Sequence, residues 1–316
     1  MSMSHRWKTL LAFGIIYIGW GSTFLAIRVG VQAMPPLVIA AIRFFIAGLA
    51  LVAWAAWRRE PWPSAREWGS ICLLAALIFV GDYGLLFWAE QRVPSGIAAV
   101  MLATIPVFIA IGEVLLLRTA RMTLQLGTAL VIGIAGVAVL MSRSLNLGGA
   151  AISTVGALAL IVASMFWSVA SVVTRRLTLP SSKVLSAGAQ MLAGGVMLAV
   201  VAIAFSEWGR FHPAAVPGKA WFALAYLILM GSIVGFTCYV WLIHHESPTK
   251  VGTYAYVNPV VAVLIGYFVG GEPLGLRTIL GTALVLASVL LITLGKSLHS
   301  KAEAPKRESV NEPCVE

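Results

Sequence analysis

The sequence predicts an all-α integral membrane protein of ten transmembrane helices, arranged as two inverted five-helix repeats with both termini in the cytoplasm. Three observations lead to this fold class. The 316 residues are 60% hydrophobic and 11% charged, whereas soluble domains carry about 25% charged residues. Long apolar runs recur along the whole chain, and its two halves share ordered sequence matches. A soluble globule of this composition would expose large apolar patches, and a disordered chain would be poor in apolar residues, so both are excluded.

Ten apolar runs are long enough to form transmembrane helices, since crossing roughly 30 Å of hydrocarbon takes about 20 mostly apolar residues. Prolines or charged residues separate them, for example Pro35-Pro36 after the first run and Glu272-Pro273 after the ninth. The first run is longer than the roughly 7–15 apolar residues of a signal peptide, so we expect a retained helix. The predicted spans are 9–28, 35–57, 68–90, 95–117, 122–142, 151–173, 184–206, 219–243, 249–271 and 275–295.

Lys and Arg residues set the expected direction of these helices, because cytoplasmic loops are enriched in them. With the N-terminus inside, most of the 22 Lys and Arg residues fall in cytoplasmic connections. The polar residues 297–316 are expected to form a disordered cytoplasmic tail. The formal charge of +10 is scattered between apolar runs without a basic stripe, so no nucleic-acid partner is expected.

The two halves of the chain resemble each other over residues 9–142 and 151–296, which we interpret as two five-helix repeats. The segment Leu-Gly-Thr-Ala-Leu-Val occurs at 126–131 and again at 280–285. Because five is an odd number, the second repeat enters the membrane from the opposite side, so the repeats are inverted. Many secondary transporters are built in this way, with substrate bound near the middle of the membrane between the repeats.

Four short segments show a family resemblance. They are Trp20-Gly21-Ser22-Thr23-Phe24, the run from Pro94 to Ala99, the run from Tyr254 to Ala262, and Gly271-Glu272. On these residues the chain resembles the EamA-type carriers of the drug/metabolite transporter superfamily, among them bacterial inner-membrane exporters. The resemblance implies ten helices in an inverted repeat, location in the inner membrane, and export of amino acids or other small metabolites. The first repeat lacks a glutamate corresponding to Glu272, so symmetry assigns this residue no role.

Three ionisable residues lie within the predicted spans, where each is a candidate functional group. Arg43 and Asp82 are expected at similar depth, and their counterparts in the second half are Gln190 and Phe236. They either form a buried ion pair that fixes helix packing, or contact substrate or a coupling proton. Glu113 lies near the cytoplasmic end of its span and is a second candidate proton carrier.

Aromatic and polar residues in the middle of several spans predict a substrate cavity. Rings could hold an apolar side chain or a cationic group, and hydroxyl or amide groups could bind a zwitterion, although the same residues also serve helix packing. Pro106 and Pro259 interrupt corresponding helices and are candidate hinges. The candidate binding residues are Trp20, Ser22, Thr23, Arg43, Asp82, Tyr83, Trp88, Trp167, Ser171, Gln190, Tyr239, Tyr254 and Asn258.

These features predict a secondary transporter that exports neutral, aromatic or hydrophobic amino acids by alternating access. The alternatives are a multidrug exporter of lipophilic cations and a lipid-handling or membrane-assembly protein. An enzyme is not expected, since a phosphate-binding loop and a metalloprotease motif are both missing and Asp82 is the single aspartate of the sequence. We expect no metal or cofactor. The expected partners are a small-molecule substrate, the lipid bilayer and, if transport is coupled, protons; the protein is expected to be a monomer or a homodimer.

Overall fold

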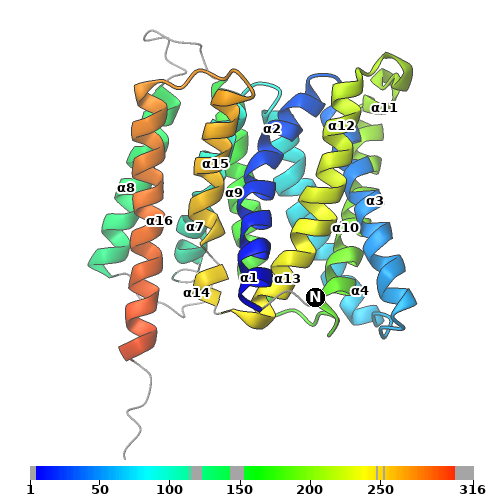
Figure 1. Cartoon of the computed structure of the whole chain (residues 1–316), viewed down its shortest axis with the longest axis horizontal. Coiled ribbons are helices and arrows are strands. Elements are labelled where there is room, and N and C mark those ends of the chain that lie inside the picture. The colour runs from blue at the N-terminus through cyan, green and yellow to red at the C-terminus, as the bar shows by residue number, and fades with distance from the viewer. Residues whose placement is uncertain are drawn as a thin grey trace, which may run out of the picture.

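A computed structural model describes residues 5–112, 114, 123–142, 153–246, 248–251 and 253–302. In these ranges every regular element is helical, and the helices stand side by side as a bundle (Figure 1). Eight of the described helices are long and apolar enough to cross a membrane, and two shorter apolar helices, Tyr254–Phe268 and Leu276–Ile292, accompany them. The prediction of an all-helical membrane protein is confirmed. The count of ten spans and the direction of the termini stay predictions.

The long helices of the two halves follow each other in a similar order, and the second half adds the short elements α11 and η5. The first half consists of α1 (His5–Gly14), η1 (Ile15–Gly19), α2 (Trp20–Val31), α3 (Pro36–Trp57), α4 (Ala65–Ala75), η2 (Ala76–Gly84), α5 (Leu85–Ala89), α6 (Ser95–Leu102), α7 (Ile105–Gly112) and α8 (Leu124–Met141). The second half consists of α9 (Thr154–Thr174), α10 (Lys183–Ala204), α11 (Glu207–Arg210), η5 (Pro213–Ala215), α12 (Gly218–Tyr226), η6 (Leu227–Val234), α13 (Gly235–His245), α14 (Pro248–Val251), α15 (Tyr254–Phe268) and α16 (Leu276–Ala302).

Local sequence explains where several helices begin. Ser64 and Glu67 form a reciprocal capping box at the start of α4, and the side chains of Ser153 and Ser182 accept from backbone amides at the starts of α9 and α10. Such side chains satisfy amides that have no partner inside the helix. Pro36 begins α3, where the missing N–H of proline costs nothing.

Equivalent helices of the two halves pack against each other. α3 packs along α10, and α8 packs along α16; these are the second and fifth helices of each predicted repeat. In α3 and α10, glycines at the contact allow the two backbones to approach closely. This pairing is the arrangement expected of two halves related by an axis between them.

The two candidate hinge prolines differ in their effect on the backbone. The helix is broken between α6 and α7, directly before Pro106, whereas Pro259 lies inside the continuous helix α15. At the C-terminal end, α16 continues to Ala302, past residue 297 where we expected the polar tail to begin. Glu113 lies outside the described residues.

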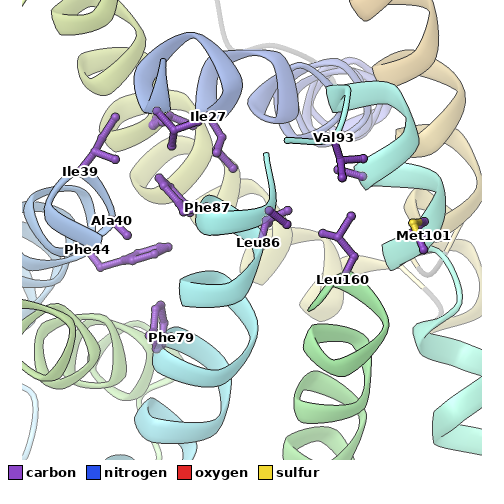
Figure 2. Packing of buried hydrophobic residues seen from close by; sticks show 14 of the residues in the cluster. Ile27, Ile39, Ala40, Phe44, Phe79, Leu86, Phe87, Val93, Met101 and Leu160 are labelled. Carbon is purple, nitrogen blue, oxygen red and sulfur yellow. The ribbon is translucent and has the colours of Figure 1, made fainter. Parts of the chain in front are cut away.

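A large apolar core fills the space between helices of both halves. Figure 2 shows its aromatic centre, where Phe44 of α3 lies against Phe79 of η2 with ring centroids 4.7 Å apart. Phe87 and Leu160 are also fully buried in this cluster. The core holds α3, η2, α5 and α9 together and so fixes the residues that surround the cavity described next.

Candidate functional site

A cavity of about 510 Å³ lies between the two halves, lined by residues from both. This volume lies in the range of sites for small ligands, which is about 300–1,000 Å³. All but two of the predicted site residues line it, namely Trp20, Thr23, Arg43, Asp82, Tyr83, Pro106, Trp167, Ser171, Gln190, Tyr239, Tyr254, Asn258 and Pro259.

Ser22 and Trp88 were predicted to line the site, and the structure places them elsewhere. The hydroxyl of Ser22 is 2.6 Å from that of Tyr226 and also donates to the carbonyl of Ile18. The ring of Trp88 lies under the guanidinium of Arg92, 4.1 Å from ring centre to Cζ. Both residues are on faces of their helices that point to other neighbours. Because these helices are apolar on nearly all sides, the sequence gives little indication of their rotation.

Arg43 on α3 brings a buried cation to the cavity. Its side chain is 3% exposed, and its Nε donates to the hydroxyl of Ser232 at 3.1 Å. The guanidinium also lies over the ring of Phe44, 4.7 Å from its centre, and 5.5 Å from the ring centre of Tyr83. Within the described part of the chain, Nη1 is buried without a hydrogen-bond partner.

Asp82 on η2 brings a buried carboxyl group to the same cavity. The residue is 1% exposed, and among the described residues its Oδ1 has no hydrogen-bond partner. The described salt bridges do not include a contact between Asp82 and Arg43, for which N and O would lie within 4.0 Å. Of the two interpretations that the sequence allows, a buried ion pair is therefore not what the geometry shows. Arg43 and Asp82 line one cavity, and none of the described salt bridges joins them.

Segments of π-helix place several of these groups. η2 and η6 occupy corresponding positions in the two halves, and they contribute Asp82 and Ser232 to the cavity. A π-helical turn widens the backbone and is frequent at functional sites. A third such segment, η1, directly precedes Trp20. With its nitrogen turned toward them, the Asn258 amide donates to backbone carbonyls of Ile16, Tyr17 and Tyr254 at 3.2–3.3 Å.

Aromatic rings form one wall of the cavity. Trp20 lies 5.4 Å from Tyr239 and 5.3 Å from Tyr254, measured between ring centres, and its indole nitrogen donates to the carbonyl of Gly231 at 3.1 Å. On another side, Tyr83 and Trp167 meet edge to face at 6.1 Å. These rings offer an apolar surface next to the two charged groups.

A charged clasp lies beyond the cavity at the distal end of the bundle, by which we mean the end opposite the N-terminus (Figure 1). Nε of Arg28 is 3.3 Å from Oε1 of Glu272. The Glu272 carboxylate also accepts from the backbone amides of Ser95 at 2.7 Å and of Gly96 at 3.1 Å. Arg28 and the amides belong to the first half and Glu272 to the second. The clasp therefore joins the two halves, a role that sequence symmetry did not indicate.

A second glutamate makes a comparable contact at the same end. Oε2 of Glu207 accepts from the backbone amides of Leu37 at 2.8 Å and of Val38 at 3.3 Å. Like Glu272, Glu207 comes from the second half and satisfies amides at the start of a first-half helix that follows a proline. A carboxylate at a helix N-terminus is favoured by the unpaired amides and the helix dipole. Glu207 also lies 3.9 Å from the exposed guanidinium of Arg210 in its own half, whereas the arginine that pairs with Glu272 comes from the other half.

Two halves of similar helices that enclose a ligand-sized cavity of polar and aromatic groups define a membrane transport protein. Comparison with known families supports this class. Residues 7–142 and 154–294 each match the EamA-like transporter family, and the chain belongs to that family.

Relatives agree with this assignment. The chain is 38% identical over 301 residues to the inner membrane transporter YedA of Escherichia coli strain K12, covering 93% of this chain and 94% of YedA. It is 25% identical to the transporter YoaV of Bacillus subtilis strain 168, covering 90% and 97% of the two chains. A solved crystal structure shares the fold, with a TM-score of 0.59 at 24% identity over 95% of this chain and 100% of that one. The protein is a multi-pass transporter of the inner membrane.

Proposed function

We propose that the protein exports neutral amino acids with aromatic or hydrophobic side chains across the inner membrane, as a secondary transporter working by alternating access. The observation that carries this proposal is a pair of buried atoms without hydrogen-bond partners, Nη1 of Arg43 and Oδ1 of Asp82, on two residues that line the cavity. A buried charge without a partner is unfavourable. A zwitterion satisfies both groups at once, with its carboxylate on Arg43 and its ammonium on Asp82.

The aromatic wall supplies the preference for the side chain. A ring or branched side chain of the substrate would lie against Trp20, Tyr239 and Tyr254, or against Trp167 on the other side. Aromatic pairs in such edge-to-face or tilted geometries contribute about 0.5–1.5 kcal/mol beyond their buried area. The cavity would open to one side of the membrane and then to the other as the two halves rearrange. The helix break before Pro106 would serve as the hinge, and Pro259 is the weaker candidate.

A second candidate is export of lipophilic cations, which the acidic Asp82 beside aromatic rings favours. Arg43 in the same cavity opposes it, because a cationic ligand would be repelled by a guanidinium that pairs with no carboxylate in the described part of the chain. The lipid-handling or assembly hypothesis gains no support from the family.

Competition in proteoliposomes separates these candidates. Uptake of labelled phenylalanine is measured against unlabelled phenylalanine, phenethylamine, phenylpropionate and tetraphenylphosphonium. If the site binds a zwitterion, phenylalanine competes at least about tenfold better than the amine or the acid, each of which leaves one buried group unpaired. Competition by tetraphenylphosphonium and phenethylamine alone would favour the cation exporter. Absence of saturable uptake by folded protein for every compound would overturn the amino-acid proposal.

A further inference from the structure

Glu90 is a buried carboxyl group directly beyond the cavity, at the end of α5. Its backbone amide donates to the carbonyl of Leu86, which lines the cavity one helical turn earlier. The residue is 0% exposed, and among the described residues neither Oε1 nor Oε2 has a hydrogen-bond partner. An ionised carboxylate in such surroundings would be strongly destabilised. This burial favours the protonated form of Glu90.

The charged groups around Glu90 come from three other segments. Arg28 on α2 and Arg43 on α3 attract a negative charge at this position, and Glu272, between α15 and α16, repels it. α9 also packs against α5, and its residues from 154 to 174 include no ionisable side chain. Burial first, and then Glu272, raise the pKa of Glu90 well above its usual range, while both arginines oppose the shift.

Arg28 contacts both the backbone of Glu90 and the carboxylate of Glu272. Its Nη1 donates to the backbone carbonyl of Glu90 at 3.1 Å and to that of Val93 at 2.5 Å, while its Nε pairs with Glu272 at 3.3 Å. The side chain of Glu90 is in the same half of the protein as Arg28. An exchange of partner from Glu272 to Glu90 would replace a carboxylate of the other half by one of the same half.

We propose that Glu90 is the proton-binding site of this transporter, and that Arg28 exchanges Glu272 for Glu90 when that proton leaves. The inference rests on the proposed transport function and adds its coupling ion, a proton, and the residue that holds it.

The exchange links proton loss to separation of the halves at the distal end. If the halves separated with Glu90 protonated, Arg28 would lose its carboxylate partner, which opposes the separation. When the Glu90 O–H releases its proton to water, the resulting carboxylate pairs with the guanidinium of Arg28. Glu272 then has no ion pair with Arg28 and can move away with the second half. Protonation of Glu90 returns Arg28 to Glu272 and closes the clasp. Rising pH therefore favours the open distal end, and falling pH the closed one.

Infrared spectroscopy of the reconstituted protein tests this directly, because a protonated carboxyl group absorbs apart from an ionised one. The pH dependence of that band is recorded for an Asp82→Asn background, which removes the other buried carboxyl of the cavity, with and without Glu90→Gln. We expect a titrating band that Glu90→Gln abolishes. Glu272→Gln, which removes the repelling charge and releases Arg28, should lower the midpoint by about one pH unit. The matched control is Glu207→Gln, which removes the other helix-capping glutamate and should leave the midpoint unchanged.

Two results would overturn the proposal. One is a carboxyl band that is the same with and without Glu90, or that does not titrate over the pH range in which the protein stays folded. The other is an equal shift in the midpoint for Glu272→Gln and Glu207→Gln. If Glu90→Gln does not fold, Glu272→Gln decides alone, since it retains Glu90. The measurement needs no solute, so its failure is distinguishable from failure of the transport proposal.

Discussion

Gly48 of α3 and Gly195 of α10 make the same contact from opposite sides of one helix pair. A Cβ atom on Gly48 would lie 2.7 Å from Cα of Leu192, and a Cβ atom on Gly195 would lie 2.5 Å from the backbone nitrogen of Phe45. Gly48 therefore contacts α10 three residues before Gly195, and Gly195 contacts α3 three residues before Gly48. Such reciprocity is what a two-fold relation between the halves requires, and it shows that the central helix pair depends on backbone contact.

Gly48→Ala should destabilise the protein, because the added methyl group would overlap the backbone of α10, which cannot move as a side chain does. Overpacking of this kind costs about 1–3 kcal/mol. Gly127→Ala is the matched control, since a Cβ at Gly127 in α8 meets nothing within 4 Å and alanine is the better helix former. Thermal unfolding of the two variants in detergent should show a lower midpoint for Gly48→Ala alone. Equal unfolding midpoints would mean that α3 and α10 can move apart without a loss of stability.

Arg43→Ala should reduce transport of phenylalanine by about tenfold or more, because a hydrogen bond to a charged group is worth about 1.5–3 kcal/mol. Gln190→Ala changes the corresponding residue of the second half, which also lines the cavity but is neutral and donates to Ser186 at 3.0 Å. It should have a much smaller effect. Initial rates at several substrate concentrations measure both, with gel filtration as the test of folding. Equal losses would assign Arg43 a structural role.

Trp20→Ala and Trp167→Ala should raise the substrate concentration for half-maximal uptake, because each removes a ring that lines the cavity. Trp20 also holds neighbouring rings and the Gly231 carbonyl, so its replacement should affect stability as well. Trp20→Phe separates the two roles, since it keeps a ring and loses the hydrogen bond. Saturation curves for phenylalanine provide the measurement. Unchanged curves for both alanine variants would show that these rings serve packing alone.

Much of this site could be predicted because charged, polar and aromatic residues in the middle of an apolar span are costly unless they face protein or water. That argument found Arg43, Asp82 and the rings, and the structure brings them to one cavity. It did not find Ser232, a small hydroxyl residue without a charge to mark it. Ser22 was misplaced because helices that are apolar all round give no indication of which face is inward.

Glu90 was missed for a different reason. It falls at the last residue of its predicted span, where a charged side chain normally reaches water. It is buried where α5 packs against α9, α3 and α2, and Arg28 of α2 donates to its backbone carbonyl. These contacts form only in the folded protein, so the sequence around Glu90 does not indicate them. The sequence match between the halves did not indicate the contact between Arg28 and Glu272 either, because the first half lacks a counterpart of Glu272.

Glu90→Gln should separate transport from the proton gradient. A neutral amide keeps Arg28 on Glu272 at every pH, so transport that is accelerated by a pH gradient in the wild-type protein should lose that acceleration. Exchange of phenylalanine across liposomes without a gradient should persist, provided that occasional breaking of the clasp still opens the distal end. Parallel uptake assays with and without a gradient measure both properties, and Glu207→Gln should behave like the wild type. A full response to the gradient in Glu90→Gln liposomes would mean that another group carries the proton, with Asp82 and Glu113 next to be replaced.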